Sequence, residues 1–148
     1  METQDSIKRI VVGIDFSIEH AKRCVDMATN ISKTSNTTMI FLTVITNSDI
    51  SDTEGKLDAT KLRKVEERAR GMHESLVLGG RILESQKVRS EFINAEDVAD
   101  AICNYCKEVE ADLVIVGRRG MGTLRGLILG SVSTKIVKNS PCSVLVVK

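Results

Sequence analysis

Residues 113–133 read LVIVGRRGMGTLRGLILGSVS and guide the interpretation of the whole chain. The first four residues form a short run that is apolar on both alternating faces, which is typical of a parallel strand buried on both sides. Glycines then recur up to Gly130, and Ser131 opens a helical pattern. Glycine lets the backbone turn and approach a ligand closely, and free amides at a helix start attract phosphate. The stretch therefore predicts a strand, an anion cradle and a helix in succession.

Three other apolar runs, at 10–14, 41–45 and 144–147, have the same character, and a half-polar run at 88–93 is typical of an edge strand. Amphipathic helical spacing separates the runs, at residues 21–31, 62–76, 98–109 and about 131–138. In the last of these we expect three inward residues, Val132, Ile136 and Val137. This alternation predicts a single α/β domain with a doubly wound, five-stranded parallel sheet and helices on both faces.

In such sheets ligands bind beyond the carboxyl ends of the strands, so the loops there are informative. The loop after the first strand places Asp15 at the strand end and a helix cap at Ser17. Residues 46–56, after the second strand, are almost entirely polar. A loop of this length and composition predicts a mobile lid or a disordered segment.

Composition excludes several classes of protein. The chain has 148 residues and only four aromatic ones, which disfavours nucleic-acid binding by base stacking. No apolar run approaches the ~18 residues of a membrane span, and the acidic start does not look like a secretory signal, so we expect a cytoplasmic protein with reduced cysteines. The net charge is +1, yet residues 113–148 hold six of the 21 basic residues and none of the 20 acidic ones. That basic quarter suits a small anionic ligand such as a nucleotide.

The spacing Gly117-x2-Gly120-x9-Gly130-Ser131 resembles the signature of the ATP-binding branch of the universal stress protein family. Neither the dinucleotide fingerprint nor a Walker loop is present. The resemblance extends over essentially the whole chain, including the opening strand with Asp15 and the terminal run at 141–147. It implies one nucleotide-binding domain over residues 1–148 with strand order 3-2-1-4-5.

The same resemblance implies a set of site residues. Asp15 would contact the adenosine, Gly13 and Ile14 would line the base pocket, and Val44 would pack on the adenine. Two residues, Val116 and Gly117, would flank the ribose and phosphates. The triphosphate would be held by Gly120, Gly130, Ser131, Val132 and Ser133. The ligand would be ATP, with ADP and AMP as further candidates, and Mg²⁺ or Mn²⁺ would bind through the phosphates.

The resemblance also implies a homodimer formed through the last strand, Ser143–Val147, acting as a nucleotide-dependent sensor or regulator with an unidentified protein partner. We assign no catalytic residue and no protein metal site, and expect at most slow ATP hydrolysis because no general base is evident. Two alternatives stay open: a dimeric scaffold of the same fold without nucleotide, and a nucleotide-consuming enzyme. Two departures from the family concern Gly13, where several relatives have proline, and residues 96–99, where many have Gly-x-Pro-Ala.

The remaining candidate residues suggest little chemistry. Cys103 and Cys106 form a C-x-x-C inside a predicted helix, where redox or zinc chemistry is not expected. His73 follows a residue of the apolar stripe and is expected to face solvent. His20 lies one helical turn beyond Asp15, close to the predicted pocket, and is not assigned a catalytic role.

Overall fold

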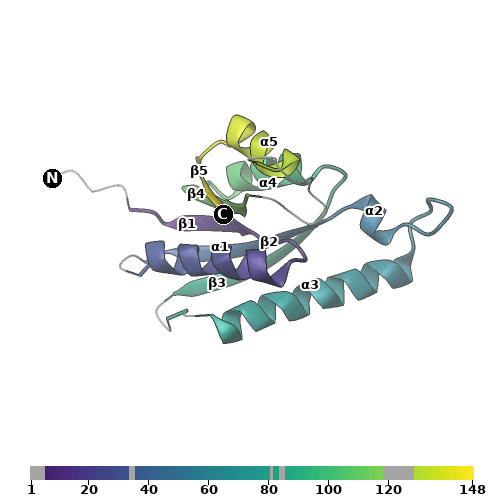
Figure 1. The fold of residues 1–148 in the computed structure, drawn as a ribbon, viewed down its shortest axis with the longest axis horizontal. Coiled ribbons are helices and arrows are strands. Elements are labelled where there is room, and N and C mark those ends of the chain that lie inside the picture. The colour runs from purple at the N-terminus through teal and green to yellow at the C-terminus, as the bar shows by residue number, and fades with distance from the viewer. Residues whose placement is uncertain (1–5, 34–35, 81, 84–85, 119–128) are drawn as a thin grey trace.

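The computed structural model describes residues 6–33, 36–80, 82–83, 86–118 and 129–148, and its strands and helices alternate along the chain (Figure 1). The strands are β1 (Arg9–Gly13), β2 (Thr38–Ile45), β3 (Lys87–Asn94), β4 (Leu113–Gly117) and β5 (Ser143–Val147). The helices are α1 (Ile18–Ile31), α2 (Asn47–Ile50), α3 (Ala59–Gly79), α4 (Val98–Glu108) and α5 (Ser131–Asn139).

The five strands form one parallel sheet in the order β3-β2-β1-β4-β5, which confirms the predicted topology. The order reverses at β1, which lies between β2 on one side and β4 on the other. The half-polar run predicted as an edge strand is β3, at one edge, and β5 forms the other. Ligand sites in sheets of this kind lie at such a reversal, outside the carboxyl ends of the strands.

Alternate residues of each strand enter two separate cores. Ile10 and Val12 of β1 pack with α1 and α3, whereas Val11 packs with α4 and α5. Figure 1 shows these two helix pairs on opposite faces of the sheet. Full burial of a side chain of this size stabilises the folded protein by roughly 1.5–3 kcal/mol, so packing on both faces fixes the sheet between its helices.

The polar loop after β2 has local structure, so the disordered segment predicted there was wrong. Thr46 begins α2 with a capping box, in which its amide donates to Asp49 Oδ2 at 2.8 Å and its side chain accepts the Asp49 amide. The Thr46 hydroxyl also donates to Asp49 Oδ2 at 2.8 Å. Ser51 then forms a bridge with Leu57, and Asp58 caps α3 by accepting from two backbone amides. The short polar side chains that suggested disorder are used to satisfy turns and helix starts.

Helix α5 differs from its prediction at two residues. Ile136 is fully buried as expected, but Val132 is 36% exposed and Val137 is 51% exposed. The helix therefore packs through a narrow stripe centred on Ile136 and Ser133, and Val132 faces the end of the sheet. The inward orientation expected for Val132 and Val137 was wrong.

The amino ends of the strands are closed by side chains that bond to backbone groups. Asp112 Oδ2 accepts from the amides of Lys8 and Arg9, at 2.7 and 2.9 Å. Gln86, which is buried, donates from Nε2 to Thr29 O at 3.1 Å and to Ser32 Oγ at 2.7 Å. These contacts fix β1 to the start of β4, and the end of α1 to the segment before β3.

No helix among the described residues combines the length and the apolar character needed to cross a membrane.

Candidate functional site

A cavity of about 350 Å³ lies where the carboxyl ends of β1, β2 and β4 meet the start of α5. The volume falls in the range of small-molecule and cofactor pockets. The cavity brings together these residues of the predicted site: Gly13, Ile14, Asp15, Val44, Val116, Gly117, Gly130, Ser131, Val132 and Ser133. The remaining one, Gly120, lies outside the described residues. Sequence positions from 13 to 133 thus converge on one cavity because every contributing strand is parallel.

Gly13 lets β1 pass close to β4 at the floor of the cavity. A Cβ atom at this position would lie 3.1 Å from Cγ1 of Val116, tighter than most such contacts. The next amide, of Ile14, donates to Leu42 O at 2.8 Å and keeps the chain tied to β2. Any larger residue at this position would require the side chain of Val116 to shift.

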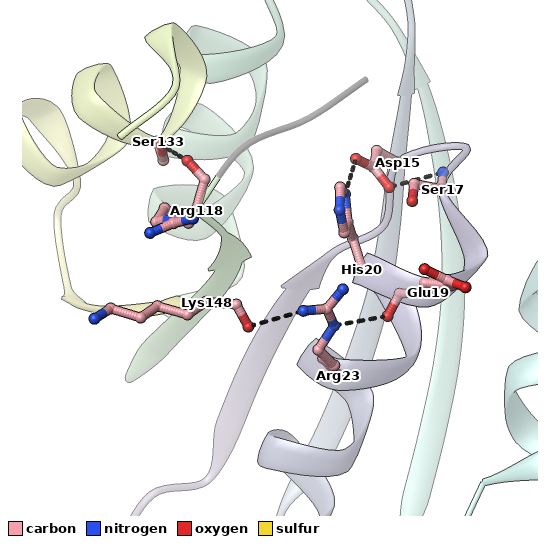
Figure 2. A network of polar contacts seen from close by, with 8 residues as sticks. All are labelled: Asp15, Ser17, Glu19, His20, Arg23, Arg118, Ser133 and Lys148. Atoms are coloured by element: carbon pink, nitrogen blue, oxygen red, sulfur yellow. Dashed lines mark hydrogen bonds and ion pairs between the residues drawn. The ribbon is translucent and has the colours of Figure 1, made fainter. Parts of the chain in front are cut away.

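Asp15 lies at the mouth of the cavity in a fixed orientation. Its Oδ1 accepts the amide of Ser17 at 2.9 Å, while Oδ2 lies 3.9 Å from Nδ1 of His20 (Figure 2). Ser17 occupies the N-cap of α1 as predicted, although its side chain makes no capping hydrogen bond. The loop thus uses the carboxylate of Asp15 to organise the helix start and to face His20.

His73 is buried behind the cavity, so the solvent-facing position expected for it was wrong. Its exposed fraction is 1%, its ring stacks on Phe92 at 4.7 Å between centroids, and its Nε2 lies 2.7 Å from Thr43 Oγ1. Thr43 donates its hydroxyl to Ile14 O at 2.9 Å, which leaves Nε2–H as the donor to Thr43. Burial lowers the pKa of His73 to about 4. The ring is thus neutral near pH 7 and supports the backbone at Ile14.

The sequence contained a signal for this burial. Ala69, His73 and Leu76 follow one another at steps of four and three, and all three are buried in α3. The predicted stripe used Met72, which is half-buried beside them. The prediction was right for Met72, which packs against the core, and wrong for His73, because the buried face of α3 is wide enough to include both.

The start of α5 lines the cavity with amides that take no part in the hydrogen bonds of the helix. Gly130 is the N-cap, and the first intrahelical bond runs from the Thr134 amide to Gly130 O at 3.0 Å. The amides of Ser131, Val132 and Ser133 precede that bond and have no partner within the helix. Together with the helix dipole, such amides favour an anion at this position.

The hydroxyl of Ser133 is used in hydrogen bonds to the protein backbone. Ser133 Oγ donates to Arg118 O at 2.9 Å (Figure 2). It also donates to Gly130 O at 3.1 Å, and the Gly130 amide donates to Arg118 O at 2.7 Å. These bonds join the residue that follows β4 to the residue that begins α5. The contribution of Ser133 to an anion is therefore left to its amide.

The segment that departs from the family pattern ties α4 to α5. Asp97 caps α4 by accepting the Asp100 amide at 2.8 Å, and Lys135 donates to Asp97 at 2.9 Å and pairs with Asp100 at 3.0 Å. The backbone bond from Asp100 and the bond from Lys135 lower the pKa of Asp97. Val98, next in sequence, lines the cavity.

The C-x-x-C motif lies inside α4, as expected, and a third thiol joins it. Cys103 and Cys106 are buried, and Cys142 packs against the same core. Burial raises the pKa of Cys103, and burial together with Cys142 raises that of Cys106 to about 12. Within the part of the chain that the structure describes, no cluster of acidic, cysteine or histidine side chains is arranged to hold a metal ion.

Several lining residues were not predicted: Phe16, His20, Ala21, Cys24, Leu42, Thr43, Thr46, Asp49, Val98 and Ile102. Phe16 is held by Arg68 of α3, whose guanidinium lies 4.8 Å from the ring centroid. Most of the others follow from the neighbours of residues that were predicted, since a strand end or helix start rarely contributes a single side chain. His20 is the member with reactive chemistry.

Comparisons with known proteins find the same family over nearly the whole chain. The sequence model of the universal stress protein family matches residues 6–148. The universal stress protein YxiE of Bacillus subtilis is 40% identical over an alignment of 78 residues that covers 47% of this chain and 53% of YxiE, so the match spans about half of that relative. A putative universal stress protein of Staphylococcus aureus is 29% identical over 145 residues, 95% of this chain and 84% of the relative.

Solved structures show the same fold. The hypothetical protein MJ0577 superposes with a TM-score of 0.82 at 26% identity, covering 97% of this chain and 96% of that one. A universal stress protein in complex with cAMP superposes with a TM-score of 0.68 at 25% identity, covering 97% and 98%.

Proposed function

We propose that this chain, which belongs to the universal stress protein family, binds ATP in the cavity at the carboxyl end of its sheet. In our proposal it acts as a homodimeric, nucleotide-dependent sensor or regulator. The observation that carries the proposal is the start of α5, where amides without an intrahelical partner and two glycines of the signature, Gly117 and Gly130, line one cavity with Asp15. A nucleotide carries both phosphates, which the α5 amides can bind, and ribose hydroxyls, which can donate to Asp15.

The proposed orientation of the nucleotide follows the chemistry of the lining. Apolar side chains of Val44, Val98 and Ile102 form one part of the wall and suit the faces of an adenine ring. The amides at the start of α5 suit the phosphates, and the Asp15 carboxylate suits ribose hydroxyls, which donate hydrogen bonds. A nucleotide complex of a related structure, the one with cAMP, supports this class of ligand.

A divalent cation, Mg²⁺ or Mn²⁺, would bind mainly through phosphate oxygens and would neutralise their charge. Protein ligands are expected to contribute little, because the described residues hold no suitable cluster. Such a mode is usual for Mg²⁺, which keeps several waters and dehydrates reluctantly.

The identity of the ligand is tested by denaturing freshly purified protein and measuring the mass of any released small molecule, followed by calorimetric titration with ATP and Mg²⁺. We expect released ATP, ADP or AMP, or a dissociation constant near micromolar, about −8 kcal/mol. ADP and AMP are titrated in parallel, since the triphosphate should bind most tightly if the α5 amides hold phosphates. Protein that releases nothing and binds none of the three contradicts the proposal and favours the scaffold alternative.

The proposed dimer forms through β5, which is an edge strand with residues Val144–Val147 still half-exposed. An open apolar edge strand is a ready site for pairing with a second copy. Val146→Glu should place a charge in that interface and convert the dimer to monomer, measured by light scattering after gel filtration. A wild-type protein that is itself monomeric at micromolar concentration contradicts this assembly.

A further inference from the structure

Among the described residues that line the cavity, four carry ionisable side chains: Asp15, His20, Cys24 and Asp49. Asp49 is engaged at the start of α2, where Oδ2 accepts the amide and the hydroxyl of Thr46. Burial, with the Asp15 carboxylate, raises the pKa of Cys24 to about 12, so this thiol stays protonated and is a weak nucleophile. The groups left for proton transfer are Asp15 and His20.

These two groups face each other in an arrangement suited to acid–base chemistry. The amide of Ser17 holds Oδ1 of Asp15, and Oδ2 lies 3.9 Å from Nδ1 of His20. Nδ1 is buried and has no hydrogen-bond partner among the described residues, although the ring as a whole is partly exposed. Hydrogen bonds of this kind are often long without ligand and tighten when one binds. A bond from Nδ1–H to Asp15 would leave Nε2 with a free lone pair.

The imidazole shares its cavity with the anion cradle. Figure 2 shows His20 and Asp15 on the α1 side, with Ser133 and Arg118 on the other. The cavity is lined by His20 from the first and by Gly117, Gly130 and Ser131 from the second. A triphosphate seated on the α5 amides would therefore occupy the same cavity as Nε2 of His20.

We propose that His20, oriented by Asp15, is the general base for slow hydrolysis of the terminal phosphoanhydride; this inference rests on the proposed nucleotide function. Nε2 accepts a proton from a water molecule, whose oxygen forms a bond to the terminal phosphorus. The bond from that phosphorus to the bridging oxygen breaks, and its electron pair leaves with the nucleoside diphosphate. The Asp15 carboxylate stabilises the imidazolium, which then returns its proton to solvent. His20 thus supplies the base that sequence patterns did not reveal.

The test measures hydrolysis of ATP with Mg²⁺ in single turnover, with protein in excess, and measures ATP affinity separately by calorimetry. We expect His20→Gln to slow hydrolysis about 100-fold, within the usual contribution of a general base, with affinity changed less than threefold. Glu19→Gln is the matched control, because Glu19 is the exposed neighbour of His20 in α1 and does not line the cavity. Its hydrolysis rate should equal that of the wild type.

Two further readouts separate a base from a structural side chain. Free imidazole should restore part of the lost rate to His20→Ala and should leave the rate of Glu19→Gln unchanged. Long-range ¹H–¹⁵N spectra of the two histidines should show the Nδ1–H tautomer for His20, and Asp15→Asn should change that pattern.

The inference is overturned if His20→Gln and His20→Ala hydrolyse ATP at the wild-type rate, or if wild-type protein binds ATP and never hydrolyses it. Both of these results leave the proposed nucleotide binding intact. Absence of binding in the calorimeter overturns the proposed function and this inference together.

Discussion

The two ends of the sheet use their polar groups in different ways. At the amino end, the side chains of Asp112 and Gln86 each satisfy two or more groups from other parts of the chain. At the carboxyl end, the amides at the start of α5 and Nδ1 of His20 face a cavity, with no partner found for that nitrogen in the described part of the chain. A buried polar group without a partner costs free energy, so the first end contributes stability and the second retains groups for a ligand.

The sharpest way to break this contrast is Gly130→Val at the carboxyl end. The added side chain would enter the cavity at the start of α5, where we place the phosphates. We expect ATP affinity to fall at least 1,000-fold, about 4 kcal/mol, in calorimetric titration, with the unfolding midpoint nearly unchanged. Gly71→Ala is the control, since no atom lies within 4 Å of a Cβ there and Gly71 is far from the cavity. Unchanged affinity in Gly130→Val means that the phosphates bind elsewhere.

Acid should weaken the fold through His73, which supports the carboxyl end from behind. Its pKa is about 4 in the fold against 6.5 for an unperturbed histidine, because burial disfavours the charged ring. In the unfolded chain the His73 ring is therefore protonated below about pH 6.5, whereas in the folded protein it is protonated only near pH 4. The contribution of neutral His73 to the free energy of unfolding is fully present above pH 6.5, and about 3 kcal/mol of it is lost as the pH drops to 4.

Urea unfolding at pH 7 and pH 4.5 measures this loss. His73→Phe removes the titrating ring while keeping an aromatic contact with Phe92, so its stability should depend less on pH than that of the wild type. An equal pH dependence in both proteins contradicts the assignment of His73.

At the amino end, Gln86→Ala should lower stability without affecting the ligand. It removes the side-chain hydrogen bonds of Gln86 to Thr29 O, to Ser32 Oγ and to the Leu83 amide, and the loss of these bonds should cost about 2 kcal/mol together. Urea unfolding measures the loss, and ATP affinity in the folded protein should stay within twofold of the wild type. A large loss of affinity would show that the two ends are coupled.

The sequence predicted most of the framework because its evidence is local. Runs such as residues 113–116 are apolar on both faces, and a strand buried between two helix layers requires that pattern. The glycine signature located the cavity, since Gly117 and Gly130 mark a strand end and a helix start whose partners follow from the parallel order. These features need no knowledge of side-chain contacts.

What the sequence did not reveal depends on contacts between distant residues. Asp112 lies 104 positions from Lys8, and Gln86 lies 57 positions from Thr29, so no local sequence pattern predicts either hydrogen bond. His73 was misplaced because the predicted apolar stripe of α3 was too narrow, and contacts with Phe41 and Phe92 from distant strands bury its ring as well. The approach of His20 to Asp15 depends on how the first turn of α1 leaves β1.

The bonds between Arg118 and the start of α5 have a consequence for how such proteins diversify. The Gly130 amide and the Ser133 hydroxyl both donate to Arg118 O, and the Arg118 amide donates to Val147 O at 2.7 Å. Residues 118 and 130 are therefore neighbours fixed to the edge of the sheet, whatever number of residues separates them in sequence. Insertions, deletions or grafted peptides between these anchors would leave the strands in register, so evolution and protein engineers can rewrite that segment separately from the scaffold.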